Sequence, residues 1–331
     1  MGRMMRDFRG RLAVVTGGGS GMGRELVRQL AAEGCHVAMC DVSSDTMAET
    51  LELCRQHRSP HGAHIGTQVS AHVADVAEED AVLRFRDAVA REHDTDKVHL
   101  LFNNAGIGGG GSLIANTREQ WERTFNICWG GVYFCTRAFL PYLMNAEKAH
   151  IVNTSSVNGF WASVGPQVPH TAYSAAKFAV KGFTEALITD LRLNAPHIQC
   201  SVVMPGHIGT SIVANSRKIQ FGTRSDAMSS EEIAHMRARL SAAGRDLSQV
   251  SDAELQKMAA ERARRFREEA PMTAAEAATV ILDGVKANRW RILVGRDAHR
   301  LDELVRQAPE AVYEEEFFAA FAAEAGWAVG R

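Results

Sequence analysis

The sequence predicts an α/β fold in which helices cover both faces of one doubly wound parallel sheet of about seven strands. From residue 12 to about 210, short apolar segments alternate with longer amphipathic ones. The apolar segments are nearly continuous, which is typical of strands buried on both faces. Polar or glycine-rich residues follow several of them directly, as loops at one edge of such a sheet do.

Seven segments are predicted as strands: Leu12–Thr16, Val37–Cys40, Val69–Ala74, Val98–Phe102, His150–Thr154, Gln199–Met204 and Arg291–Val294. The helices predicted between them cover about residues 22–33, 46–57, 79–92, 118–144 and 173–194. Gly130 and Gly131 lie inside the fourth of these helices. Because glycine weakens a helix, this pair predicts close backbone packing there.

Residues 211–271 are rich in charge and poor in β-branched side chains, which predicts a helical insertion with two helices. The first runs from Ser229 to Gly244 and the second from about Ser251 to Glu269. Arginines of the second helix alternate with glutamates, which favours a solvated face over an anion site. A helix and the last strand are expected in residues 272–297, and a helical extension in residues 298–331.

The amino-acid composition limits which classes of function are plausible. The chain has 331 residues, 46% of them hydrophobic, and a formal net charge of −2, so we expect a small-molecule partner rather than nucleic acid or a membrane surface. Its six cysteines are scattered without metal-ligand spacing, which argues against a disulfide framework or a metal site. With no signal core and no membrane-spanning apolar stretch, these features predict a cytoplasmic protein.

A glycine-rich turn follows the first strand in the segment Thr16–Gly23. Backbone N–H groups of such a turn can face a pyrophosphate at the positive end of the next helix, which makes Gly17, Ser20, Gly21, Met22 and Gly23 candidate cofactor contacts. The spacing departs from the G-x-G-x-x-G pattern, so a simple turn is the alternative interpretation.

Asp41 ends the second strand, 20 residues after Gly21, where an acidic side chain can bind the adenosine ribose hydroxyls. A carboxylate there repels a 2′-phosphate. Neither the glycine-rich loop nor the positions just after Asp41 hold Arg or Lys, so the sequence favours NAD(H) over NADP(H).

Short motifs that each contain a polar residue follow four further strands. They are Asp75 and Val76 after the third, Asn103, Ala105 and Gly106 after the fourth, Ser155 and Ser156 after the fifth, and Pro205, Gly206, Ile208 and Thr210 after the sixth. The carboxyl edge of an open α/β sheet is where ligands bind, so we expect one site there.

Tyr173 and Lys177 are four residues apart on a predicted helix, so a phenol and an ammonium share one face. A fixed positive charge nearby favours phenolate, and we therefore expect Lys177 to lower the pKa of Tyr173.

Taken in order, these motifs resemble those of the classical short-chain dehydrogenase/reductase (SDR) family, which has a Rossmann-like fold, over about residues 8–210 and 271–297. The resemblance implies that Tyr173 is the general acid/base and that Ser156 hydrogen-bonds the substrate oxygen. It also implies that Tyr173 and Lys177 both contact the cofactor, with Lys177 holding the nicotinamide ribose. Asn126 would support a proton-relay water. Asp75 and Val76 would hold the adenine, and Ile208 and Thr210 the nicotinamide carboxamide.

The function implied is an NAD(H)-dependent oxidoreductase that interconverts a secondary alcohol and a ketone, with a hydrophobic substrate. A 3-oxoacyl-thioester reductase is one alternative, although such enzymes commonly use NADPH, which Asp41 disfavours. A non-catalytic NAD(H)-sensing protein is another, although it would not need the proton-handling set of Asn126, Ser156, Tyr173 and Lys177.

Two features depart from the family pattern. Sixteen residues separate Ser156 from Tyr173, which is longer than usual and predicts a reshaped substrate pocket, and the choice of Ser156 over Ser155 rests on alignment. Residues 211–271 are longer than the usual substrate lid, and their helices could close over a ligand or bury their apolar faces against the body or a partner subunit. We expect one SDR domain over residues 1–331, with 8–210 as its core, and a homodimer or homotetramer formed through the helices that carry Asn126 and Tyr173.

Overall fold

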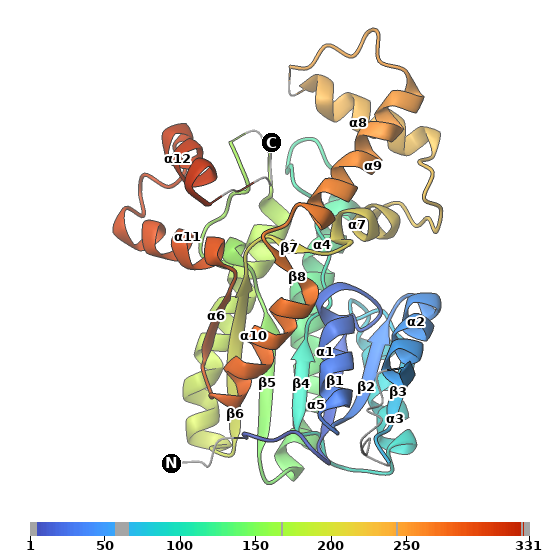
Figure 1. The fold of residues 1–331 in the computed structure, drawn as a ribbon, viewed down its shortest axis with the longest axis vertical. Helices are drawn as coiled ribbons and strands as arrows, with labels where there is room; N and C mark the ends of the chain where they lie inside the picture. The colour runs from blue at the N-terminus through green and yellow to red at the C-terminus, as the bar shows by residue number, and fades with distance from the viewer. Residues whose placement is uncertain (1–4, 57–65, 167, 243, 326, 328–331) are drawn as a thin grey trace.

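The computed structural model describes residues 5–56, 66–166, 168–242, 244–325 and 327. The remaining residues are drawn in grey in Figure 1. Some of them belong to predicted elements, namely the helices 46–57 and 229–244, the C-terminal extension and the ends of the predicted domain. At those positions the predictions lie outside the described residues.

A parallel seven-stranded sheet forms the centre of the fold, in the order β3-β2-β1-β4-β5-β6-β9. The strands are β1 Leu12–Thr16, β2 His36–Asp41, β3 Val69–Val73, β4 Leu100–Asn103, β5 Ala149–Thr154, β6 Ile198–Pro205 and β9 Arg291–Val294. All seven predicted strands are confirmed, as is the doubly wound order. The strand order reverses between β1 and β4, which is the switch point where such sheets bind ligands.

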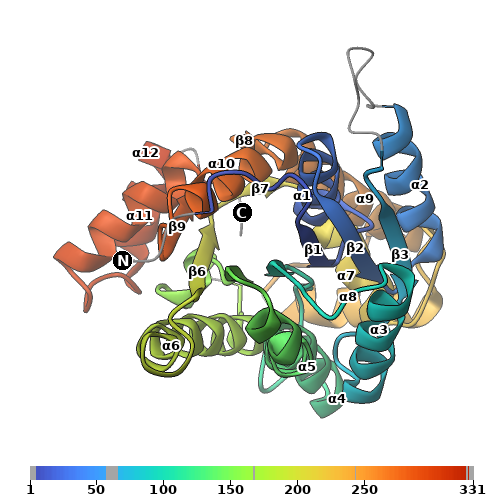
Figure 2. The ribbon, with the colours of Figure 1, turned by 90° about the horizontal axis from the view of Figure 1, so that it is seen from below.

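Helices cover both faces of the sheet, as Figure 2 shows from below. One face carries α1 (Gly21–Ala32), α2 (Ser44–Gln56) and α10 (Ala274–Lys286), and the other carries α3 (Glu79–Glu92), α5 (Gly131–Asn145) and α6 (Thr171–Asn194). Along β1 alternate residues enter the two cores: Val15 packs with Leu26 and Ile281, whereas Val14 packs with Phe139 and Ile151. Burial on both faces explains the continuous apolar character of the strands.

The helix predicted over residues 118–144 is divided. It consists of α4 (Arg118–Phe125), a π-helical turn over Asn126–Gly130, and α5. The close packing expected at the glycine pair is confirmed at Gly131, where an added Cβ would lie 2.6 Å from Cγ2 of Val76. Such π-helical turns occur frequently at functional sites, and this one begins at Asn126.

The described residues of the insertion form three helices, not the two predicted: α7 (Ile212–Gln220), α8 (Ser230–Ala242) and α9 (Asp252–Glu268). They stand beyond the carboxyl edge of the sheet (Figure 1). Two short strands, β7 (Ile208–Gly209) and β8 (Met272–Thr273), pair in parallel and join the two ends of the insertion at its base.

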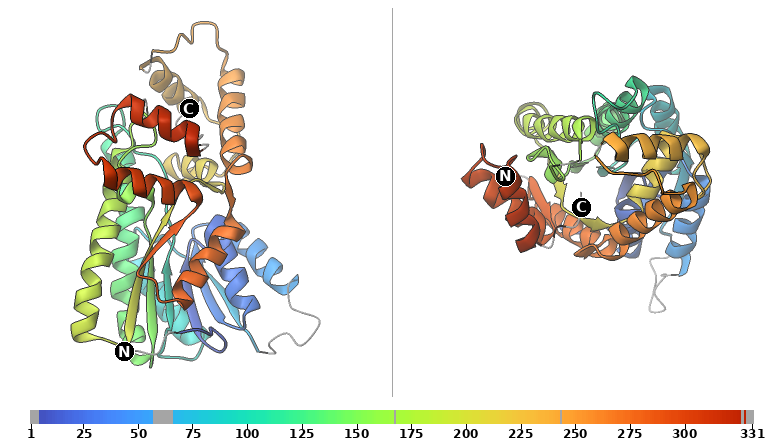
Figure 3. Two further views of the ribbon diagram at one scale, coloured as in Figure 1. Left: turned by 60° about the vertical axis from the view of Figure 1, so that its left-hand side comes forward. Right: turned by 90° about the horizontal axis from the view of Figure 1, so that it is seen from above.

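The C-terminal extension forms α11 (Arg296–Gln307) and α12 (Glu315–Ala325), which stand above the same edge as the insertion (Figure 3). It packs on the long segment that precedes Tyr173. Trp161 of that segment is fully buried among Phe321 and Trp327, and its Nε1 donates to the carbonyl of Val312 at 2.8 Å. Trp161 is therefore packing mass that fixes the segment.

Candidate active site

The glycine-rich turn needs its glycines for steric reasons. Gly17 and Gly21 have φ of +68° and +54°, which L side chains rarely adopt. A Cβ on Gly17 would lie 2.9 Å from Cα of Ala105, and one on Gly23 would lie 2.0 Å from the carbonyl oxygen of Gly17. The N-terminus of α1 and the loop after β4 therefore approach each other closely, which is the cradle that a pyrophosphate needs.

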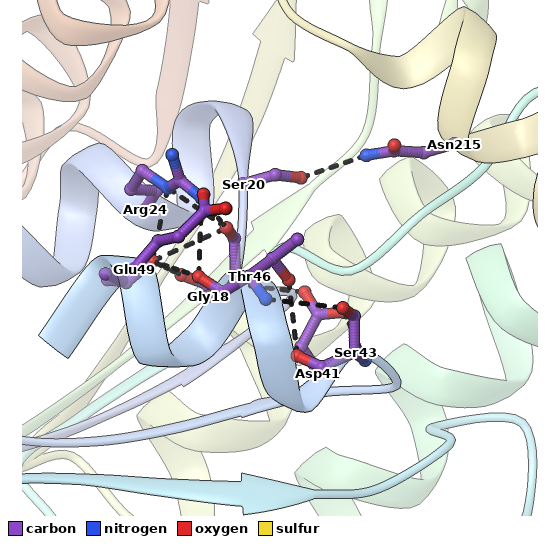
Figure 4. A network of polar contacts seen from close by, with 10 residues as sticks. Gly18, Ser20, Arg24, Asp41, Ser43, Thr46, Glu49 and Asn215 are labelled. Atoms are coloured by element: carbon purple, nitrogen blue, oxygen red, sulfur yellow. Dashed lines mark hydrogen bonds and ion pairs between the residues drawn. The ribbon is translucent and has the colours of Figure 1, made fainter. Parts of the chain in front are cut away.

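Asp41 lies beside this turn, and its carboxylate accepts the N–H of Gly19 at 3.0 Å and of Ser43 at 3.2 Å (Figure 4). Burial raises its pKa, and those hydrogen bonds oppose the rise. Each carboxylate oxygen keeps a lone pair for a ribose hydroxyl, so the side chain fits the role predicted for it.

The sequence reading missed Arg24, one residue beyond the glycine-rich turn. Its guanidinium donates to the carbonyl of Gly19 at 2.6 Å and pairs with Glu49 at 2.7 Å (Figure 4). Because Glu49 balances the charge, Arg24 holds the loop rather than offering a free cation to a phosphate. The partners are 25 residues apart, so no local pattern could reveal them.

Two other predicted cofactor contacts have competing partners. Asp75 pairs through Oδ2 with Arg123 at 2.6 Å. The side chain of Asn103 points into the core, where Nδ2 donates to Asn153 at 2.8 Å and to Thr136 at 3.0 Å. Nδ2 of Asn103 is thus used within the core, where its Oδ1 is buried without a partner, so a ligand would meet the backbone of Asn103. A lone pair of Asp75 remains for an adenine amine.

Tyr173 and Lys177 share one face of α6, with Nζ 5.4 Å from the centre of the phenol ring. The expected lowering of the Tyr173 pKa by Lys177 is wrong for this structure: burial raises that pKa, Cys128 adds to the rise, and only a hydrogen bond with Ser156 lowers it. Lys177 is itself buried, which lowers its own pKa, and Nζ donates to the carbonyl of Thr154 at 2.8 Å. Desolvation of the phenol thus outweighs the nearby ammonium.

The two adjacent serines have different roles. Ser155 Oγ donates to the backbone carbonyl of Lys177 at 2.7 Å and so joins β5 to α6. Ser156 Oγ accepts the N–H of Asn158 at 3.1 Å and hydrogen-bonds Tyr173. The geometry therefore favours Ser156 as the serine that meets a substrate.

The elements around this group hold the remaining predicted residues. Gly106 faces Lys177, because a Cβ there would lie 3.5 Å from Nζ. Asn126 begins the π-helical turn, and its carbonyl accepts the N–H of Gly131. A Cβ on Gly21 would lie 3.2 Å from Cγ2 of Thr210, so the glycine-rich turn and the segment after β6 meet.

A buried carboxylate that the sequence reading missed holds the segment after β6. Oδ2 of Asp297 accepts the N–H of His207 at 2.6 Å, and a Cβ on Gly206 would lie 2.3 Å from the same atom. Asp297 belongs to α11, 90 residues from His207. It fixes the backbone around Pro205 and Ile208, both of which are buried.

Over the part of the chain that the structure describes, no three acidic, histidine or cysteine side chains are grouped as metal ligands. Within the same residues no helix is long and apolar enough to cross a bilayer.

The sheet order, the glycine cradle and the Ser156–Tyr173–Lys177 group define a doubly wound α/β protein of the Rossmann type. Residues 11–220 match the short chain dehydrogenase family. The chain therefore belongs to the short-chain dehydrogenase/reductase family of oxidoreductases.

Three relatives illustrate the likeness. The putative oxidoreductase SadH of Mycobacterium tuberculosis is 34% identical over 91% of this chain and 92% of its own. A short-chain dehydrogenase/reductase from Burkholderia phymatum, solved in complex with NAD, is 30% identical with a TM-score of 0.69, over 93% of this chain and 96% of its own. A metagenomic short-chain oxidoreductase in complex with NADP is 27% identical with a TM-score of 0.51, over 60% of this chain and 83% of its own.

Proposed function

We propose that this protein is an NAD(H)-dependent oxidoreductase that interconverts a secondary alcohol and a ketone, with Tyr173 as the general acid/base. The observation that carries the proposal is the group at the carboxyl edge of the sheet. There Ser156 hydrogen-bonds the Tyr173 phenol and Lys177 Nζ lies 5.4 Å from its ring. The glycine-rich turn that fits a dinucleotide lies at the same edge.

When bound, the nicotinamide supplies or accepts the hydride, so the protein has only to orient the substrate and manage one proton. The hydroxyls of Ser156 and Tyr173 would hold the substrate oxygen and stabilise the alkoxide that develops there. A raised pKa keeps the Tyr173 phenol protonated near neutrality, as a proton donor must be when a ketone is reduced. Lys177 would hold the nicotinamide ribose, and Asn126 would support a relay water.

The choice of NAD(H) over NADP(H) rests on Asp41. Its carboxylate is held in place by Gly19 and Ser43, and a 2′-phosphate brought to it would meet a negative charge. The neighbouring cation Arg24 is balanced by Glu49. That the Burkholderia phymatum relative was solved with NAD supports this choice, while the NADP complex of another relative makes the test necessary.

The test is turnover with both cofactors and a panel of aliphatic, aryl and steroid alcohols and ketones, followed by NADH absorbance. We expect turnover of hydrophobic secondary alcohols, and a kcat/KM with NADH at least tenfold above that with NADPH. Tight NADH binding with no turnover across the panel would favour an NAD(H) sensor. Faster reduction of 3-oxoacyl thioesters with NADPH would favour the thioester reductase.

We propose that the chain is one domain in which residues 211–271 cover the substrate. The contacts of α7 support this: Asn215 donates to Ser20 Oγ at 3.1 Å (Figure 4), and Ser216 Oγ accepts the N–H of Gly108 at 2.8 Å. The helix thus joins the glycine-rich turn to the loop after β4. Deleting residues 224–268 should raise KM for substrate far more than KM for NADH. An equal rise in both would show that the insertion is a general support of the fold.

We also propose a homodimer or homotetramer, formed through α5 and α6. Tyr133 and Met144 on α5 are 40% and 44% exposed, and Phe178 and Leu193 on α6 are 42% and 77% exposed, so both helices present apolar side chains that a partner subunit would cover. Light scattering after size exclusion should give at least twice the chain mass, and Phe178→Asp should lower it. A wild-type monomer would refute the proposal. The cytoplasmic location stays a prediction.

A further inference from the structure

One face of α9 is turned toward the candidate active site. Leu255, Arg262 and Phe266 are spaced along one side of the helix at helical intervals. Leu255 is fully buried within the insertion, in a cluster with Ile233 and Leu247, whereas Phe266 reaches the segment after β6. The ring of Phe266 lies 4.4 Å from the ring of His207, and the Phe266 carbonyl is 2.8 Å from His207 Nε2. Arg262, one turn before Phe266, therefore lies on the side of α9 that faces the segment after β6.

The outer arginines of the same helix are electrically balanced. Arg264 pairs with Glu261 and Glu268, Arg265 with Glu269, and Arg267 with Glu268, and all three side chains are about half exposed. The prediction of a solvated arginine face is confirmed for these residues.

Arg262 differs from them. Within the described part of the chain, neither Arg262 nor Arg245, in the loop before α9, forms an ion pair with a carboxylate. The two guanidinium groups are close enough that Arg245 lowers the pKa of Arg262, after the larger effect of burial. Two neighbouring cations without a counter-charge leave a local positive field that favours an anion.

The charge of Arg262 acts on a residue that neighbours the reacting group. The ring of His170 lies 4.8 Å from the ring of Tyr173. Burial lowers the pKa of His170 to about 4, and the charge of Arg262 contributes to that shift. The side chain of Arg262 is exposed to solvent. The protein atoms around it are nevertheless dense enough to lower its pKa. A guanidinium is thus available to a ligand close to His170, the ring neighbour of Tyr173.

We propose that Arg262, supported by Arg245, binds an oxyanion group, a carboxylate or a phosphate, on a substrate whose carbonyl or hydroxyl is held by Ser156 and Tyr173. A guanidinium binds either oxyanion through two parallel hydrogen bonds, which fixes orientation as well as charge. The inference rests on the proposed function and adds to it the substrate class: a hydrophobic ketone or alcohol with an anionic group.

Binding is tested on the full chain saturated with NADH, by calorimetric titration with hexanoate, hexyl phosphate and the neutral hexanamide. We expect the wild type to bind at least one of the two anions about tenfold or more tightly than hexanamide. Arg262→Gln should remove that preference and Arg262→Lys should keep part of it. The matched control is Arg264→Gln on the outer face of the same helix, which should bind like the wild type. The two anionic probes separate a carboxylate site from a phosphate site.

Equal affinity of the wild type for the anions and the amide, or a preference that survives Arg262→Gln, would overturn the inference. Turnover separates this outcome from a failure of the proposed function. A methyl-ketone carboxylate should have a KM about tenfold or more below that of its methyl ester, and Arg262→Gln should raise only the KM of the acid. Turnover of neutral ketones without anion selectivity refutes the anion site alone, whereas anion-selective binding with no turnover of any ketone refutes the proposed function alone.

Discussion

Replacing Tyr173 by Phe tests the proton transfer directly. The substitution removes one oxygen, which hydrogen-bonds Ser156, and leaves a ring of the same shape beside Lys177. Loss of a general acid/base lowers turnover by about 10²- to 10⁴-fold, or roughly 3–5 kcal/mol of barrier. Ser156 remains to stabilise the substrate oxygen, so some activity should persist.

The assay is steady-state ketone reduction followed by NADH absorbance, with NADH affinity measured separately by fluorescence. Affinity should stay within about twofold of wild type, since the phenol oxygen is not proposed to bind the dinucleotide strongly. Tyr133→Phe is the control, because Tyr133 is an exposed residue of α5 and should leave kcat unchanged. A Tyr173→Phe variant with kcat within a few-fold of wild type would refute the general acid/base role.

The same variant tests the direction of the Tyr173 pKa. Burial raises this pKa above its ordinary value of 10.0, so the phenol of the free protein should stay protonated through pH 10. The chain has only four tyrosines, which makes one phenol measurable in an ultraviolet titration. The difference between the titration curves of the wild type and of Tyr173→Phe should show no phenolate absorbance until the pH exceeds 10. Phenolate in that difference between pH 7 and 9 would mean that the charge of Lys177 prevails over burial.

Three further predictions concern the charge of Asp41, the burial of Trp161 and the pKa of His150. Asp41→Ala combined with Val42→Arg, at an exposed position, should shift the kcat/KM ratio toward NADPH by about tenfold or more, and an unchanged ratio would show that another feature selects the cofactor. Trp161→Ala should lower the free energy of unfolding by about 3–5 kcal/mol in denaturant titrations, because the side chain is fully buried, and a loss below about 1 kcal/mol would contradict its packing role. Burial lowers the pKa of His150 from 6.5 to about 4, so between these pH values the unfolded chain binds a proton that the folded chain does not. The contribution of the neutral His150 to the free energy of unfolding is therefore fully present above pH 6.5 and is lost as the pH falls toward 4. His150→Gln should make unfolding free energy less dependent on pH in that window, by up to about 1.4 kcal/mol per pH unit, and parallel curves for both proteins would contradict this.

The features that the sequence predicted correctly are local ones. Most strands of the sheet are short runs of buried residues, although β3 and β9 at its two edges are only partly buried. The pairing of Tyr173 with Lys177 follows from four-residue spacing within one helix. The glycine-rich turn was recognisable because Gly17 and Gly21 adopt positive φ, which few other residues tolerate. Such signals need no knowledge of what lies across the sheet.

The features that were missed depend on distant partners or on a break in periodicity. Helix α7 is nine residues long with Asn215 and Ser216 at its centre, both poor helix formers, and these side chains bind Ser20 and Gly108 instead. The π-helical turn at Asn126 interrupts a segment whose pattern fits one continuous helix. The pKa of Tyr173 was predicted in the wrong direction because spacing reports a neighbouring charge but not how deeply the phenol is buried.

The helical insertion and the C-terminal extension both contact one residue, His207. His207 follows β6, and its ring contacts Phe266 of the insertion at 4.4 Å and Trp327 of the C-terminal extension at 6.4 Å. Asp297 holds its backbone from α11. His207 is next to Ile208, one of the predicted nicotinamide contacts. The insertion and the C-terminal extension therefore both contact the segment where hydride transfer is proposed. The residues of the family motifs would then supply the chemistry, and α9 and the C-terminal helices would decide which substrate reaches it.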